Sequence, residues 1–161
     1  MNQKVTAIII CSLVCLSITS CMSVKSQRNS VNEGTATLYE VQSCSVNTTI
    51  DSITDDLVSA QVLNMISSQL CIDNQVDDES SPLTLSVTLT QRQFFKDLDC
   101  LNSIYLFFTL IDENGRTVMS EGYFVDTKDS LVSSVQQNKL AAQVASSCAS
   151  YLMQCRKTRT E

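Results

Sequence analysis

The sequence predicts an α+β domain: an antiparallel sheet of about four strands with two helices packed on one face, in the order β-α-β-β-β-α. Three observations support this fold class. Residues 83–90 alternate apolar and hydroxyl side chains with the period of a strand. Apolar residues recur at helical spacing over residues 54–71 and 130–156. An Asn-Gly pair at 114–115 separates two further apolar runs.

The first strand and the first helix are expected between residues 35 and 71. Residues 35–46 are rich in Thr, Val and Tyr, which is typical of strands, although their alternation is imperfect. Ser52 is followed three residues later by Asp55, and this capping pattern predicts the start of a helix, with Asp56 adding favourable charge. We interpret the two carboxylates as capping groups rather than as an acid/base pair. The apolar stripe of this helix consists of Val58, Val62, Leu63, Ile66 and Leu70.

The clearest strand follows Pro82. Its apolar residues are Leu83, Leu85, Val87 and Leu89, and its hydroxyl residues are Thr84, Ser86, Thr88 and Thr90. The apolar side chains are expected to cover a core, while the hydroxyl row faces solvent or a partner. This hydroxyl row is therefore the predicted partner face.

The last three elements are a hairpin and a closing helix. Residues 104–111 form an apolar run, and residues 117–125 supply the returning strand. Asn114 and Gly115 between them predict a hairpin turn, because both residue types tolerate positive φ. The closing helix is expected over residues 130–156, with a loosened first part. Its apolar face consists of Leu140, Val144, Cys148, Tyr151, Leu152 and Cys155.

The composition excludes several classes of function. The chain contains no histidine and no tryptophan, so a Ser-His-Asp or Cys-His nucleophile is impossible and the commonest metal ligand is missing. Its 17 acidic and 11 basic residues give a net charge of −6, which argues against binding nucleic acid through phosphate contacts. No cofactor motif and no CxxC pair occurs, so we predict a protein that is not an enzyme and binds neither a metal nor a cofactor.

The start of the chain has the features of a bacterial secretory signal. Residues 1–16 carry one positive charge and then an apolar run that is too short to span a bilayer. They are followed by Ile18, Thr19, Ser20 and Cys21. These residues resemble the bacterial lipobox, which implies cleavage between Ser20 and Cys21 and acyl lipid on the cysteine. An ordinary secretory signal, leaving a plain thiol, is the alternative.

The predicted organisation has three parts: a signal peptide over residues 1–20, a lipidated N-terminus and flexible tether over residues 21–34, and one domain over residues 35–161. The tether is assigned because its segment is almost entirely polar. The lipoprotein resemblance also implies a location. Met22 after the cysteine, rather than Asp, implies the outer membrane, with the domain in the periplasm.

Five cysteines lie in the predicted mature domain in addition to the lipidated one. They are Cys44, Cys71, Cys100, Cys148 and Cys155. An exported chain meets an oxidising compartment, so one or two disulfides and at least one free thiol are expected. If successive elements alternate in direction, Cys71 and Cys155 lie at matching ends of two parallel helices, with Cys44 and Cys100 toward the opposite end. These two pairs are the hypothesised disulfides.

The order of elements resembles that of small accessory lipoproteins of the bacterial envelope, such as those associated with lipid and lipopolysaccharide transport. The resemblance rests on the lipobox, the polar tether, the helix over residues 54–71, the hairpin over residues 104–125 and the closing helix to Cys155. It implies an anchored, non-enzymatic adaptor subunit of an envelope assembly or lipid-transport complex.

Two other functions remain open. The protein is alternatively a carrier of lipid or of another small apolar ligand, with Tyr105, Phe107 and Phe108 lining a pocket between sheet and helices. Core packing is the plainer explanation of these aromatic residues. The third function is that of a surface-exposed structural or host-contact lipoprotein.

Overall fold

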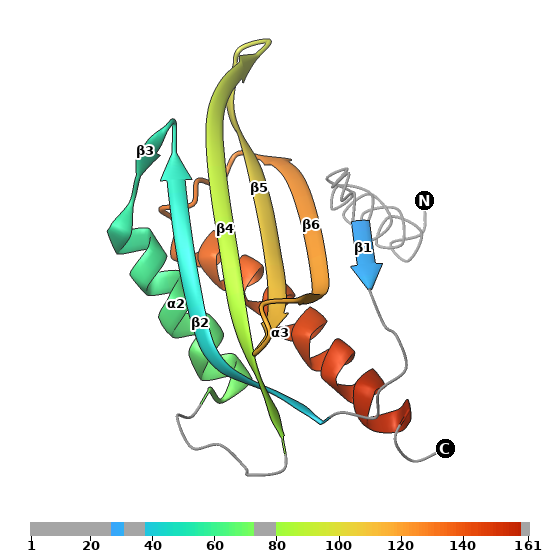
Figure 1. Cartoon of the computed structure of the whole chain (residues 1–161). Coiled ribbons are helices and arrows are strands. Elements are labelled where there is room, and N and C mark those ends of the chain that lie inside the picture. The colour runs from blue at the N-terminus through green and yellow to red at the C-terminus, as the bar shows by residue number, and fades with distance from the viewer. Residues whose placement is uncertain (1–26, 31–37, 73–79, 159–161) are drawn as a thin grey trace, which may run out of the picture.

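The protein is an α+β domain, as the sequence predicts, with a mixed sheet that two helices cover on one face (Figure 1). A computed structural model describes residues 27–30, 38–72 and 80–158. The sheet has six strands in the order β1-β6-β5-β4-β2-β3. The elements are β1 (Gln27–Ser30), β2 (Tyr39–Ile50), β3 (Ile53–Thr54), α2 (Asp56–Leu70), β4 (Ser81–Lys96), β5 (Asp99–Asp112), β6 (Thr117–Thr127) and α3 (Ser134–Thr158).

Strands β2 and β4 are parallel neighbours, so the prediction of a purely antiparallel sheet is wrong at this point. The reason is α2, which leaves the end of β2 and returns the chain to the start of β4. Parallel strands need such a crossover, whereas a tight hairpin joins antiparallel strands. The other neighbouring pairs in the sheet are all antiparallel.

Two short strands extend the sheet beyond the predicted set. β3 has two residues and folds back on the end of β2, through a turn in which Asp51 and Ser52 have positive φ. β1 pairs with β6 over Gln27–Ser30, within the segment that the sequence predicts to be a flexible tether. Alternation over two or four residues gives no usable signal, so the sequence pattern could not predict either strand.

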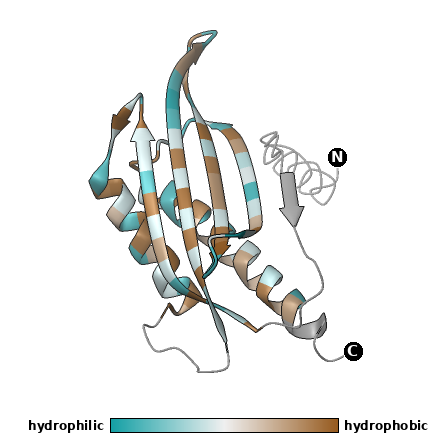
Figure 2. Ribbon diagram, in the orientation of Figure 1, coloured by the Kyte–Doolittle hydropathy of each residue, from teal (hydrophilic) through white to brown (hydrophobic). Residues whose placement is uncertain are grey.

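The core lies between the sheet and the helices. The predicted alternation in β4 is confirmed, since Leu83, Leu85, Val87 and Leu89 are at most 1% exposed. Figure 2 shows the resulting alternate bands of hydrophobic and hydrophilic residues along this strand. Burial of each such side chain contributes roughly 1.5–3 kcal/mol. The helices add Val58, Val62, Ile66, Leu140, Val144, Cys148, Tyr151 and Cys155, mostly as predicted.

The first helix, α2, begins directly after Asp55. The carboxylate of Asp55 accepts a hydrogen bond from the Val58 backbone N–H at 2.9 Å, so Asp55 is the N-cap and its capping role is confirmed. The predicted cap, Ser52, lies instead in the turn between β2 and β3. The helix ends at Cys71, which has a left-handed conformation and donates its backbone N–H to the Ser67 carbonyl.

The second helix, α3, begins at Ser134 rather than at residue 130. The preceding loop is held by Gln91 of β4, whose side-chain oxygen accepts hydrogen bonds from Ser130 Oγ at 3.0 Å and from the Leu131 N–H at 2.6 Å. This contact fixes the buried Leu131 side chain over the end of the core. Among the described residues, no helix is both long and apolar enough to cross a membrane.

The hairpin predicted at Asn114 and Gly115 is confirmed between β5 and β6. Of the two residues, Gly115 has the positive φ, at 75°. Asp112 closes the turn: its carbonyl accepts from the Gly115 N–H at 2.9 Å, and its carboxylate accepts from the N–H groups of Asn114 and Arg116. The turn therefore depends on Asp112 as well as on the glycine.

The β4–β5 hairpin is much longer than the sequence predicts. The two strands continue to a two-residue turn at Asp97 and Leu98, where Asp97 has a φ of 57°. The neighbouring strands stop earlier, because β2 ends level with Gln91 and β6 ends level with Asn102. Residues 94–101 therefore form a two-stranded projection, which we call the hairpin extension and which rises above the sheet in Figure 1.

Candidate functional site

The face of the sheet opposite the helices is covered by none of the described elements. Its central part, which we call the open face, combines neighbouring positions of four strands. The open face consists of Ser43, Ser45, Asn47 and Thr49 of β2, Thr84, Ser86, Thr88 and Thr90 of β4, Tyr105, Phe107, Thr109 and Ile111 of β5, and Ser120, Gly122 and Phe124 of β6.

All four residues of the predicted partner face lie on the open face. Thr84 and Thr88 are exposed, while Ser86 and Thr90 are half-buried. β2 doubles this hydroxyl row, and Ser43 Oγ donates a hydrogen bond of 3.0 Å to Thr84 Oγ1. The sequence analysis missed the β2 row, because a register shift between Val41 and Ser43 interrupts the alternation of that strand.

An aromatic cluster lies beside the hydroxyl rows. Tyr105 is 48% exposed and Phe107 is 51% exposed. The ring of Tyr105 packs against that of Phe124 from the next strand, with 4.6 Å between centroids and a tilt of 46°. Phe107 lies opposite Gly122, so no side chain from β6 covers its ring from that position. The sequence analysis did not single out Phe124, because its place beside Tyr105 depends on strand register.

The three aromatic residues proposed to line a pocket between sheet and helices do not share one environment. Phe108 is fully buried in the core and stacks with Tyr123, at 6.1 Å between centroids. Tyr105 and Phe107 point to the opposite face, because successive side chains of a strand alternate. That assignment of the pocket lining is therefore wrong for Tyr105 and Phe107, and for Phe108 the plainer explanation of core packing is correct.

The open face contains no charged side chain among the residues that define it. Charged residues lie at its two ends, with Glu40 at the start of β2 and with Arg92 and Asp126 toward the hairpin extension. A charge-free centre with aromatic residues is the composition of the core of a protein–protein interface. The hydroxyl rows can donate and accept hydrogen bonds at its margin.

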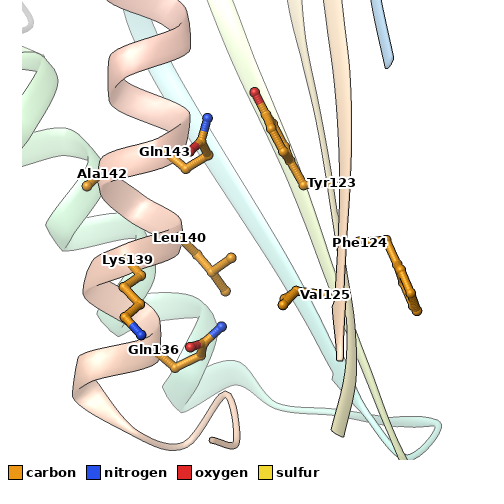
Figure 3. Close-up of a pocket in the computed structure, with 8 residues that line it drawn as sticks. All are labelled: Tyr123, Phe124, Val125, Gln136, Lys139, Leu140, Ala142 and Gln143. Carbon is orange, nitrogen blue, oxygen red and sulfur yellow. The ribbon is translucent and has the colours of Figure 1, made fainter. Parts of the chain in front are cut away.

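A separate pocket lies on the helix side, between β6 and α3. It has a volume of about 490 Å³, and its lining is mostly apolar. Figure 3 shows Tyr123, Val125 and Leu140 directed into the space between strand and helix, and Phe124 directed away from it. Gln136 also lines the pocket, and its side-chain oxygen is buried without a hydrogen-bond partner among the described residues.

A short polar chain lies beside this pocket and joins β6 to α3. The Tyr123 hydroxyl donates to the Glu121 carboxylate and lies 3.1 Å from Ser147 Oγ. Glu121 and Ser147 are both buried. Because these contacts connect two elements inside the domain, we interpret them as structural.

All five described cysteines are free thiols. Cys44 is level with Leu85 of β4, whereas Cys100 pairs with Phe95 near the end of the same strand. Ten residues of β4 separate these levels, or about 33 Å at the rise of a strand. A disulfide requires α-carbons within about 7 Å, so this fold does not bring together the hypothesised Cys44–Cys100 pair.

The second hypothesised pair is also not brought together. Cys71 is exposed at the C-terminal end of α2, and Cys155 is buried near the end of α3. Both helices run in the same general direction, but Figure 1 shows their C-terminal ends on different sides of the domain. Cys148 lies in the core, where burial, with smaller contributions from Cys44 and Glu121, raises the pKa of its thiol to about 12.

The predicted signal peptide, the cleavage position at Ser20 and the lipidation residue Cys21 lie outside the described residues. They remain predictions from the sequence.

Comparison with known proteins finds similarity among solved structures. No protein-family model matches the chain, and no curated protein is significantly similar to it. Two crystal forms of a PelC dodecamer from Paraburkholderia phytofirmans, one of them a point variant, are similar at 18% and 17% identity, with TM-scores of 0.49 and 0.48. The similarity covers 75% of this chain and 93% and 94% of those chains.

A further similar structure is the crystal structure of an uncharacterized protein. It is 17% identical, with a TM-score of 0.33, over 74% of this chain and 92% of that chain. At these identities and TM-scores, the similarities support no inference about the function of this chain.

Proposed function

We propose that the chain is a bacterial outer-membrane lipoprotein, anchored through acyl chains on Cys21, and that its domain is a non-enzymatic adaptor. In this function the domain docks through its open face onto a protein subunit of an envelope complex. The proposal of docking rests on the composition and exposure of the open face. The support for the anchor is the lipobox-like segment from Ile18 to Cys21 behind an apolar run.

The chemistry of the open face favours a protein as the docking partner. Tyr105 and Phe107 each leave about half of their surface exposed in the isolated domain, and a partner that covers them gains apolar burial at one central point. Aromatic residues in such a position are enriched among the side chains that dominate binding energy. The surrounding Ser and Thr side chains suit a margin that excludes water and exchanges hydrogen bonds.

The absence of charge on the open face adds to this preference. The chain as a whole has a net charge of −6, so the acidic groups are concentrated elsewhere. A docking surface for a charged partner would present complementary charge at its centre. We therefore expect a partner surface that is flat, uncharged and equipped with a shallow apolar depression for the two rings.

The test is affinity purification of the full lipidated chain from gently solubilised envelopes, with a photoreactive amino acid in place of Thr88. The expected result is one envelope protein that co-purifies in stoichiometric amount and crosslinks from position 88. In the double variant Tyr105→Ser/Phe107→Ser, recovery of this protein should fall at least about tenfold, the equivalent of 1.4 kcal/mol.

Met153→Ser is the matched control, since Met153 is a 63% exposed apolar residue on α3, away from the open face. The control should retain the partner at the wild-type level. Equal recovery with the double variant, or no crosslink from position 88, would rule out docking through the open face. Intact-mass analysis of the same preparation tests the acyl modification of Cys21 separately.

The pocket between β6 and α3 favours a second function, that of a carrier for a small apolar ligand. Its volume of about 490 Å³ falls in the range of ligand sites. The unpartnered Gln136 oxygen could accept a hydrogen bond from a polar end of such a ligand. Lipid that is released from the purified protein on extraction, and lost in Leu140→Gln, would support the carrier instead of the adaptor.

A further inference from the structure

The exposed apolar side chains of the domain are concentrated at one end. Among the described residues, nine large apolar side chains are exposed, and six of them belong to this end. Their positions are the hairpin extension, the short strand β3, the first turn of α2, and the loop before α3 with the first turn of that helix. The six residues are Ile53, Leu57, Phe95, Leu98, Val132 and Val135.

The hairpin extension is the most exposed part of this end. Leu98 is fully exposed and Phe95 is 78% exposed, with no helix or third strand beside them. Exposure of two large apolar side chains at a projecting tip is unfavourable in water. An isolated two-stranded projection is also only marginally stable by itself. Both features indicate a tip that is covered when the protein is in place.

The position of β1 at the N-terminal side of the domain indicates what covers the tip. Gln27 of β1 is level with Gly122, Phe107 and Thr88 across the sheet. Because β1 is antiparallel to β6, the N-terminal end of β1 is directed toward the end of the sheet that carries the hairpin extension. A lipid on Cys21 would therefore hold this end of the domain toward the membrane.

The segment between Cys21 and β1 is shorter than the distance from the level of Gln27 to the tip. Six residues separate Cys21 from Gln27, and they reach at most about 20 Å when fully extended. Ten residues of the hairpin separate the level of Thr88 from Leu98, which is about 33 Å along a strand. An upright domain on a fully extended tether thus extends its tip about 13 Å past Cys21, so the tip reaches the membrane interface. This distance is sufficient for the insertion depth of about 5–10 Å of interfacial apolar groups.

The charges near the tip are compatible with the headgroup region. Asp97 and Asp99 adjoin Leu98, and Asp99 forms an ion pair of 2.9 Å with Lys128. Lys96 and Lys128 match these two aspartates, so the tip itself has no net charge, whereas Asp126 and Asp129 beside Lys128 add negative charge at its base. The same charged groups would oppose passage into the hydrocarbon centre, which limits insertion to the interface.

We infer that the tip of the hairpin extension, with Leu98 and Phe95, inserts into the interface of the leaflet that holds the lipid anchor. This inference rests on the proposed lipidation of Cys21 and adds a second membrane contact to it. The two contacts together would hold the domain upright. The open face would then stand roughly along the membrane normal, accessible from the side.

The absence of tryptophan from the chain provides a direct test. Leu98→Trp places a single tryptophan at the tip, and Met153→Trp places one at an exposed position near the end of α3 as the matched control. The full lipidated proteins are reconstituted in vesicles of phosphatidylethanolamine and phosphatidylglycerol, with and without brominated acyl chains. Tryptophan emission and its quenching are measured on the vesicle-bound fraction.

The expected result is a shift of Leu98→Trp emission to shorter wavelength and strong quenching by brominated lipid, with neither effect for Met153→Trp. Vesicle-bound protein with an unquenched tip overturns the inference and leaves the anchor intact. An intact mass without lipid on Cys21 refutes the anchor and, because the inference depends on the anchor, refutes the inference as well.

Discussion

The two faces of the sheet use the same kinds of residue for different purposes. Phe107 and Phe108 are adjacent in β5, yet Phe108 is fully buried under the helices while Phe107 is half exposed on the open face. In β4, four buried aliphatic residues alternate with four hydroxyl residues in the same way. One strand thus supplies stability from one face and a contact surface from the other.

The strongest test of this comparison is the pair Phe108→Ala and Phe107→Ala. Removal of the buried ring should lower the free energy of unfolding by about 3–5 kcal/mol, because the core loses apolar burial and gains a cavity. Removal of the half-exposed ring should lower it by only about 0.5 kcal/mol. Urea unfolding measures both values. Similar losses for the two variants would mean that the open face is covered in the isolated domain.

A second pair of variants tests the end of the covered face. Gln91→Leu should destabilise the domain by about 1–3 kcal/mol, because the buried Leu131 N–H loses its acceptor. Gln93 lies on the same face of β4 but is exposed, so Gln93→Leu should change stability by less than about 0.5 kcal/mol. If urea unfolding gave no difference between the two variants, the loop before α3 would not depend on Gln91.

The smallest expected effect is the pH dependence of stability that arises from the thiols of Cys44 and Cys148. Burial raises the pKa of Cys44 from 9.0 to about 11 and that of Cys148 from 9.0 to about 12. A thiol with a raised folded-state pKa stabilises the protein fully below the unfolded value and loses this contribution as pH rises toward the folded value. Stability should therefore decline above about pH 9, and less so in Cys148→Ala.

The control for this pH dependence is Cys71→Ala, since Cys71 is exposed. The urea midpoint of this variant should decline between about pH 8 and pH 10.5 by the same amount as the wild-type midpoint. If Cys148→Ala retained the full wild-type decline, the Cys148 thiol would not be the titrating group. In the folded protein, alkylation should modify the exposed Cys71 and Cys100 well before the buried Cys148.

The parts of the fold that the sequence predicts correctly are those determined within one element. The alternation in residues 83–90 and the apolar stripe from Leu140 to Cys155 each repeat with a definite period. The parallel pairing of β2 with β4 could not be predicted in this way, because it depends on where α2 returns the chain. The hairpin extension was missed because Asp97 adopts positive φ in a turn that has no Gly, Pro or Asn.

In the candidate site, too, features determined within one strand were predicted, and features that depend on the pairing of strands were not. The β4 half of the open face was predicted, since alternation alone assigns Thr84 and Thr88 to one side. The contact of Tyr105 with Phe124 joins residues of two strands and depends on their register. The hypothesised disulfides failed for a related reason, because the distance between Cys44 and Cys100 depends on the full length of β4.

The crossover between β2 and β4 has a consequence for the order of folding during synthesis. β4, β5 and β6 are joined by short turns and can pair locally, whereas the long β2–β4 ladder needs partners more than thirty residues apart. A chain that emerges N-terminus first therefore exposes β2 and α2 before any partner strand has arrived. We expect amides of β4–β6 to gain protection first in pulsed hydrogen exchange, and simultaneous protection of β2 would contradict this order. β2, which pairs with β4 and with the two-residue β3, is thus the strand with the longest need of protection from aggregation.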